Sequence, residues 1–329
     1  MKNVICCTIY FMKARYFFFL AAIVLINACG SNEDEKKNDT PTATQDSVVK
    51  EEKLPSLEKE FADTLNVKPV EEAVLLKFNF QKGKTYNYAM TFDVSQKKGD
   101  QLRGNTMKWN FDMHVTDENK DVKTIKTTYK RIDMAMNMPN GQKMEFSSEK
   151  KVDAMDFMQI PSRMFGIIKG KSFTMQVNGK GEIVSVSGFD KIGEAVVSEM
   201  NLPEGMKPMM QQNFQKQFNN DAAKQVFSQA FEIYPNKSVK IGDSWKSNST
   251  LAALKQDITT VYKVKNIKGN RVFVNGESKL KSSDGKSSGT QTSKLIIDAK
   301  TGLMIDGVFD QKNDDGGMSS KSRITGKEI

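Results

Sequence analysis

The folded part of the chain is predicted from an alternation of apolar and polar residues that begins near Val74. Apolar side chains recur at every second position in segments such as 86–94 and 107–115, with polar residues between them. A period of two is typical of strands that have one buried face and one face in contact with water. Gly, Asn, Asp and Pro residues separate the segments, as expected of hairpin turns. The pattern therefore predicts a mainly β fold with long, curved antiparallel sheets.

The periodicity changes in the middle of the chain. Residues 162–168, 190–200, 208–218 and 221–231 have helical spacing, and Asp221 is a suitable N-cap for the last of these segments. The strand pattern then returns in five segments: 258–267, 271–280, 289–298, 303–310 and 318–325. We therefore expect a helical insert between two sets of strands. The Ser-, Thr- and Lys-rich face of the second set is expected to be in contact with water.

A weak internal repeat relates the two sets of strands. Gly83-Lys84-Thr85-Tyr86 opens the first set and Gly242-Asp243-Ser244-Trp245 opens the second, while Gly181-Glu182-Ile183 and Gly302-Leu303-Met304 close them. The repeat favours two half-barrel-like sheets joined by the helical segment. One continuous sheet with chance similarity is the alternative.

The N-terminal segment has the features of an export signal. Lys13 and Arg15 precede an uncharged stretch over residues 16–28, which is shorter than the about 20 residues that a membrane-spanning helix needs. The stretch ends in Leu25-Ile26-Asn27-Ala28-Cys29-Gly30, which resembles the lipobox of bacterial lipoproteins. The resemblance implies a signal peptide over 1–28 and acylation of Cys29 with diacylglycerol and a palmitate-type chain. An ordinary secretory signal is the alternative, and the start codon (Met1 or Met12) stays open.

Residues 29–72 are predicted to form a disordered acidic tether. After Cys29 this segment has 12 acidic residues, 6 lysines and few large apolar side chains, so it cannot bury enough surface to offset the entropy of ordering. Leu57, Phe61 and Leu65, at a spacing of four, predict one short helix within it. Glu33-Asp34-Glu35 resembles the acidic surface-export signal of Bacteroidetes-type lipoproteins. We expect a lipid-anchored protein of the outer membrane, with the periplasmic face and the cell surface both left open.

The charge and the residue types limit the chemistry. Residues 73–329 have 12 more basic than acidic residues, dispersed along the sequence, which suits an anionic glycan or an envelope protein better than nucleic acid. His114 is the only histidine, and after removal of residues 1–28 the only cysteine is Cys29. Histidine triads, histidine zinc sites and thiol nucleophiles are therefore excluded. We expect no enzyme activity, no cofactor and no metal. A hydrolase that uses paired carboxylates is kept as a further hypothesis, after the two functions given below.

Methionine is the one unusual enrichment, since 12 methionines lie between positions 134 and 210. Three interpretations remain: an ordinary core, a pocket for an acyl chain, and a soft-metal site at Met134-Ala135-Met136-Asn137-Met138. The candidate residues for an apolar pocket come from the strands and from the helical insert. They are Met134, Met136, Met138, Trp109, Phe111, Met209, Met210, Phe214, Phe227 and Phe231.

The segment from Tyr234 to Trp245, YPNKSVKIGDSW, and the later Ile297-Asp298-Ala299-Lys300-Thr301-Gly302-Leu303 resemble an uncharacterised family of Bacteroidetes-type envelope lipoproteins. The resemblance covers roughly residues 75–329, and its motifs are turns that imply no chemistry. The layout is also similar to the half-barrels of lipoprotein carriers, which hold acyl chains against a concave apolar sheet.

These expectations combine into one division of the chain. The signal peptide (1–28) and tether (29–72) precede a first β half (73–188), a helical insert (189–233) and a second β half (234–329). The predicted function is non-catalytic binding of a lipid or other amphipathic ligand in the cell envelope. A structural or interaction module that contacts protein or glycan is the alternative. The identity of the ligand and the oligomeric state stay open.

Overall fold

The computed structural model describes residues 57–63, 73–98, 101–137, 142–153, 156–200, 205, 207–217, 219–251, 256–282, 285, 287–314 and 316–329. The predicted signal peptide and Cys29 lie outside the described residues, as does Met138. Within the described part, no helix has both the length and the apolar character needed to cross a membrane.

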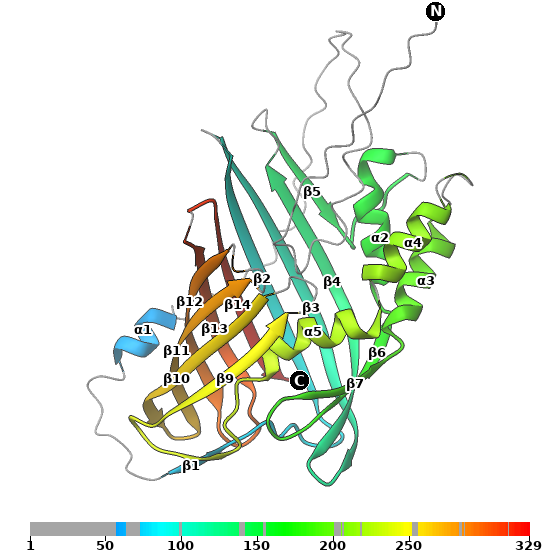
Figure 1. Cartoon of the computed structure of the whole chain (residues 1–329). Helices are drawn as coiled ribbons and strands as arrows, with labels where there is room; N and C mark the ends of the chain where they lie inside the picture. Colours follow the sequence, from blue (N-terminus) through cyan, green and yellow to red (C-terminus); the bar gives the residue numbers. More distant parts are fainter. Residues whose placement is uncertain are drawn as a thin grey trace, which may run out of the picture.

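Two sets of long strands form most of the fold (Figure 1). The first set consists of β2 (Thr85–Lys98), β3 (Gln101–Asn119), β4 (Val122–Asn137), β5 (Lys143–Ser147), β6 (Ser172–Val177) and β7 (Ile183–Ser187). The second set consists of β9 (Ser244–Leu251), β10 (Gln256–Lys268), β11 (Arg271–Ser282), β12 (Ser288–Asp298), β13 (Met304–Asn313) and β14 (Met318–Glu328). The prediction of a mainly β fold with a helical insert is therefore confirmed.

The two sets form one continuous antiparallel sheet. The strand order is β7-β6-β4-β3-β2-β14-β13-β12-β11-β10-β9, with β5 paired to β4. The junction is the pairing of β2 with β14, which runs from Gln96–Met318 to Tyr86–Glu328. The expectation of two separate sheets is therefore wrong, because hydrogen bonds join the first strand of one set to the last strand of the other. The sheet curves but does not close, and its open edges are β7 and β9 (Figure 1).

The helices between β5 and β9 lie on the concave side of this sheet (Figure 1). After a 3-10 turn (Phe157–Gln159), α2 (Ile160–Ile168) contacts β4 and β5, and α3 (Phe189–Glu199) contacts α2, α4 (Lys207–Gln217) and β6. The last helix, α5 (Asn220–Phe231), contacts both β7 and β9, so it spans the open side between the two edges (Figure 1). The N-cap of α5 is Asn219, whose side-chain oxygen accepts a hydrogen bond from the backbone N–H of Ala222 at 2.8 Å. The expectation that Asp221 would cap this helix is wrong, since Asp221 lies in its first turn.

Two small elements flank the sheet. β1 (Val74–Leu76) pairs with β8 (Lys237–Val239), which joins the start of the fold to the segment after the helical insert. α1 (Leu57–Asp63) confirms the short helix predicted in the tether. Leu57 packs against Phe273 and Ile296, and Arg271 binds Glu60 at 3.1 Å, so tertiary contacts stabilise a helix too short to be stable alone.

The core under α5 is aromatic. The rings of Phe80 and Tyr86 stack with centroids 3.8 Å apart, and Phe78 meets Phe231, the last residue of α5, edge-to-face at 5.6 Å. All four side chains are buried. Gly181, in the turn between β6 and β7, packs directly against the backbone carbonyl of Phe231. These contacts fix the C-terminal end of α5 over the concave face.

Candidate functional site

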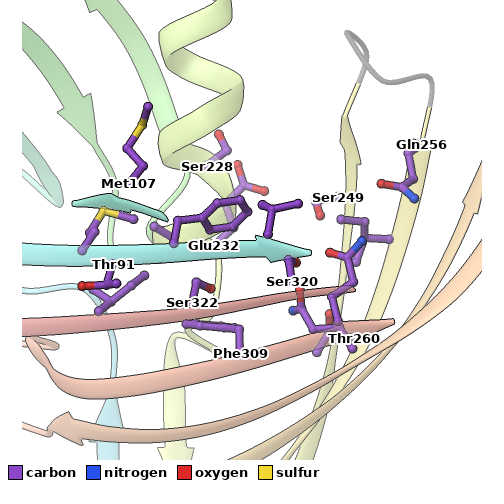
Figure 2. A pocket seen from close by; sticks show the side chains of 18 of the residues that line it. Thr91, Met107, Ser228, Glu232, Ser249, Gln256, Thr260, Phe309, Ser320 and Ser322 are labelled. Carbon is purple, nitrogen blue, oxygen red and sulfur yellow. The ribbon is translucent and has the colours of Figure 1, made fainter. Parts of the chain in front are cut away.

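A pocket lies between the concave face of the sheet and the C-terminal half of α5 (Figure 2). Its volume is about 150 Å³, and it is partly open to solvent. A closed apolar cavity of about this size holds a benzene-sized molecule. Because this pocket is open on one side, a longer molecule can place one end inside and extend outward. The lining comes from β2, β3, α5, β9, β10, β12, β13 and β14.

One wall of the pocket is apolar. Met90, Phe92 and Val94 alternate along β2, and Met107 and Trp109 do the same on β3. A period of two places all five on one face, and that face is the concave one. This wall belongs to the first set of strands, whose alternation of apolar and polar residues was clear from the sequence.

The opposite wall is polar but has no charged residue among those described. It is made by hydroxyl and amide side chains from five strands of the second set. They are Ser247, Ser249, Gln256, Thr260, Gln291, Gln311, Ser320 and Ser322. Ser249, Gln256, Thr260, Ser320 and Ser322 are labelled in Figure 2. Gln256, Thr260 and Ser320 are buried, which corrects the expectation that serine and threonine of this set face water. The apolar side chains of Tyr262, Phe309 and Ile324 lie among them.

The sheet register aligns six of the polar side chains of the second set in one row. Adjacent strands pair Ser247 with Thr260, Thr260 with Ser278, Ser278 with Gln291, Gln291 with Gln311, and Gln311 with Ser320. At the junction the row passes from Ser320 to Val94 of the apolar wall. We call these six residues the polar row. Strands lie about 4.8 Å apart, so the row is roughly 24 Å long.

Glu232, which follows α5 directly, is the only charged residue among the described residues of the lining (Figure 2). Partial burial raises the pKa of its carboxyl, and a hydrogen bond from the Ser228 side chain opposes that shift. The segment around it is held to β9 by two hydrogen bonds. Ser247 Oγ donates to the Glu232 carbonyl at 3.0 Å, and Trp245 Nε1 donates to the Ile233 carbonyl at 3.0 Å.

A smaller apolar cavity of about 10 Å³ adjoins the pocket beneath α5. It shares Met90, Trp109, Ala230 and Ile324 with the pocket. Its other lining residues are Tyr88, Phe111, Phe227, Phe231 and Met304. This cavity extends the apolar wall deeper into the core.

The structure brings together only part of the predicted apolar site. Trp109 lines the pocket and the smaller cavity, while Phe111, Phe227 and Phe231 line the smaller cavity. The remaining candidates among the described residues lie outside both linings. Met134, Met210 and Phe214 are buried core residues, Met136 is half-buried, and Met209 is 49% exposed on α4.

The sequence reasoning missed the polar row and the β2 part of the apolar wall. One signal for the row was present in the sequence. In β10 to β14, charged residues such as Lys279, Lys294 and Lys321 occupy positions of the convex face; Glu328, at the end of β14 opposite Tyr86, is an exception. Among the described residues, no group of three His, Cys, Asp or Glu side chains is arranged to hold a metal ion.

Comparison with solved structures gives remote similarities. Lipovitellin, in a structure titled for its lipid–protein interactions, is 12% identical with a TM-score of 0.44; the match covers 76% of this chain and 25% of lipovitellin. An outer membrane channel from Pseudomonas putida F1 is 6% identical with a TM-score of 0.25, over 80% of this chain and all of that chain (100%). A domain described as outer membrane lipoprotein-sorting, from Vibrio parahaemolyticus, is 7% identical with a TM-score of 0.13, over 83% of this chain and 90% of that chain.

No curated protein matches the sequence. The open, curved sheet with the helices between β5 and β9 on its concave side agrees with the predicted half-barrel-like layout. A protein family described only as being of unknown function matches residues 120–304, from the end of β3 to the start of β13. This match spans more than half of the sequence and confirms the expectation of an uncharacterised family. The chain belongs to this family of unknown function, DUF6263.

Proposed function

We propose that the protein binds a lipid or another amphipathic molecule in the pocket under α5 and does not transform it. The observation that carries this proposal is the lining, which places an apolar wall opposite a wall of hydroxyl and amide groups. Ligand pockets commonly combine a mainly apolar lining with a few directed polar groups. An amphiphile can satisfy both walls at once.

The absence of catalysis is part of the proposal. Glycoside hydrolysis needs two carboxyl groups within about 5–10 Å of each other. Among the described lining residues Glu232 is the only acid. His114 is exposed on β3, its Nδ1 lies 2.9 Å from Thr85 Oγ1, and it is not among the lining residues.

We also propose that the chain is anchored in the outer membrane through acylated Cys29, which lies outside the described residues. Two or more acyl chains give stable anchoring where a single chain is marginal. Cells grown with labelled palmitate should yield labelled protein, and Cys29→Ser should abolish the label. Label that persists in Cys29→Ser would refute the anchor and leave the pocket proposal intact.

The pocket proposal is tested with a matched pair of variants. Ser322 lines the pocket from β14, and Ser319 lies on the same strand with its side chain on the opposite face. Ser322→Trp should fill the pocket and abolish binding of the fluorescent apolar probe N-phenyl-1-naphthylamine, while Ser319→Trp should bind as the wild type does. Equal binding by both variants would contradict the proposal.

Mass spectrometry supplies an independent test. The full chain, extracted from its native membrane with a mild detergent, should carry a lipid that organic solvent releases. Ser322→Trp should carry less of the same lipid than Ser319→Trp. If no lipid accompanies the wild type and the probe does not bind, the alternative of a structural or interaction module gains support.

A further inference from the structure

We infer that the ligand of this pocket is an amphiphile with an uncharged head group rich in hydroxyl groups, as in a monoacylglycerol or a neutral glycolipid. The head group lies along the polar row and the hydrocarbon chain lies against β2 and β3. This inference rests on the proposed function, because it names the class of amphiphile. Three features of the lining carry it.

The first feature is the continuity of the polar row. Five of its six members line the pocket, namely Ser247, Thr260, Gln291, Gln311 and Ser320. The row therefore offers hydrogen-bonding groups at about 4.8 Å intervals along one direction of the concave face. A head group with several hydroxyl groups can bond to successive members, whereas a single carbonyl or ether can use only one.

The second feature is the unused bonding capacity in the middle of the row. Thr260 Oγ1 and Ser278 Oγ lie 2.8 Å apart and bond to each other, and Ser247 bonds to the Glu232 carbonyl. The side-chain amides of Gln291 and Gln311 make no hydrogen bond within the part of the chain that the structure describes. Each amide has two donor hydrogens and an acceptor oxygen, which match the dual character of a hydroxyl group.

The third feature is the charge of the lining. The chain from residue 73 onward has an excess of 12 basic residues, yet no lysine or arginine is found among the described lining residues. The lysines of the second set, such as Lys263 and Lys294, are exposed on the convex face. Glu232 adds a carboxyl group at the Ser247 end of the row. An anionic head group would lose its hydration without gaining a cationic partner there.

The head and tail of such a ligand would be separated at the junction of the two sets. Ser320 pairs with Val94 and Ser322 pairs with Phe92 across β14 and β2. The polarity of the concave face therefore changes between two adjacent strands. This boundary assigns the hydroxyl groups of the ligand to β9–β14 and its chain to β2 and β3.

A displacement experiment with two closely matched lipids tests the inference. The wild-type chain is loaded with N-phenyl-1-naphthylamine, and the probe is displaced with 1-monooleoylglycerol or with the same molecule bearing a 3-phosphate. 1-Octadecene provides a chain without a head group. We expect monooleoylglycerol to bind about tenfold more tightly than either of the other two, because the phosphate would lose its hydration without gaining a cation and octadecene has no hydrogen-bonding group.

Variants of the row locate the effect. Gln291→Leu and Gln311→Leu keep the approximate volume but remove the amides. Each should weaken monooleoylglycerol binding about three- to tenfold and leave octadecene binding unchanged or tighter. Thr290→Leu is the control, because Thr290 neighbours Gln291 on β12 and is exposed on the opposite face.

The outcomes separate this inference from the proposed function. Equal binding of the neutral and phosphorylated lipids, or preference for the phosphate, would overturn the uncharged head group while amphiphile binding stands. Failure of every lipid to displace the probe would refute the proposed function itself. A tenfold preference that survives in both glutamine variants would show that the polar row does not hold the head group, and would overturn the inference.

Discussion

The position of α5 over the pocket depends on a glycine in another part of the fold. Gly181, in the turn between β6 and β7, has a φ of +79°, and a Cβ added there would lie 1.8 Å from the carbonyl oxygen of Phe231. Gly83 has nearly the same backbone conformation, with a φ of +82°, but a Cβ there would meet nothing within 4 Å. Gly181→Ala and Gly83→Ala therefore share the cost of a left-handed backbone conformation, but only Gly181→Ala adds a steric clash.

The shared cost is the left-handed backbone conformation, which is unfavourable by about 1–2 kcal/mol for a residue with a Cβ. Gly181→Ala also forces the new methyl group against the backbone at the end of α5, which can move only if the helix moves. Overpacking of this kind costs about 1–3 kcal/mol. We expect Gly83→Ala to lower the free energy of unfolding by about 1–2 kcal/mol and Gly181→Ala to lower it by about 2–5 kcal/mol.

Guanidinium unfolding followed by circular dichroism measures both changes. Displacement of the end of α5 would also move Glu232, so Gly181→Ala should lower the affinity for N-phenyl-1-naphthylamine, whereas Gly83→Ala should not. If the two variants agree in stability within about 0.5 kcal/mol, the contact between the turn and the helix does not constrain α5. The account of how α5 is positioned would then be wrong.

Three further predictions concern single side chains. Burial raises the pKa of the Glu232 carboxyl, so this group stabilises the folded state most at a pH below its pKa in the unfolded chain. The free energy of unfolding of the wild type, relative to that of Glu232→Gln, should therefore fall as the pH rises through the pKa of the folded state. A difference in unfolding free energy that does not change between pH 4 and 8 would refute this. Arg323→Met should lower the free energy of unfolding by about 1–2 kcal/mol, because the largely buried Asp306 carboxylate loses the two hydrogen bonds of 2.6 and 3.0 Å that Arg323 donates. An unchanged midpoint in thermal or chemical unfolding would contradict this prediction. Lipid binding should shift the tryptophan emission of Trp245→Phe, which retains Trp109 in the lining of the pocket. It should not shift the emission of Trp109→Phe, which retains only Trp245. The reverse result would place the ligand elsewhere.

Much of the fold could be predicted from local patterns. In β2 and β3, apolar and polar residues alternate, and the buried faces that this pattern indicates, with Tyr86, Tyr88 and Phe111, are those observed. The N-cap of α5 was misplaced by two residues, because Asn219 and Asp221 are both good caps and local sequence does not distinguish them. In the structure Asn219 makes the cap, since its side-chain oxygen accepts the hydrogen bond from the Ala222 N–H.

The joining of the two sets of strands could not be predicted in the same way. β2 and β14 are separated by almost the whole folded chain, and their register depends on which edges meet after the sheet has curved. Neither strand contains a local signal for its partner, because hairpin turns specify only strands that are close in sequence. The internal repeat was visible, but it did not show whether the two sets share hydrogen bonds.

The candidate site was predicted on its apolar side only. Trp109, Phe111, Phe227 and Phe231 are large apolar residues at strand or helix spacing, so they could be recognised as candidates for a pocket. The polar row was not recognised, because Ser, Thr and Gln occur on both faces of β10–β14. The period of two shows there only in charged residues such as Lys279, Lys294 and Lys321, which occupy convex-face positions. Met134 and Met210 are buried in the core, which agrees with the ordinary-core interpretation of the methionine enrichment.

The architecture and the proposed ligand class depend on each other through the junction of β2 and β14. The apolar wall belongs to the first set of strands and the polar row to the second, so neither set contains both halves of the pocket. In two separate half-barrels, the first set of strands would have an apolar surface and the second set a surface rich in hydroxyl and amide groups. Pairing of Val94 with Ser320 brings these surfaces together on one concave face, and α5 covers the place where they meet. The hydrogen bonds that unite the sheet therefore also create the amphipathic lining, and they determine which end of a bound amphiphile lies on which set of strands.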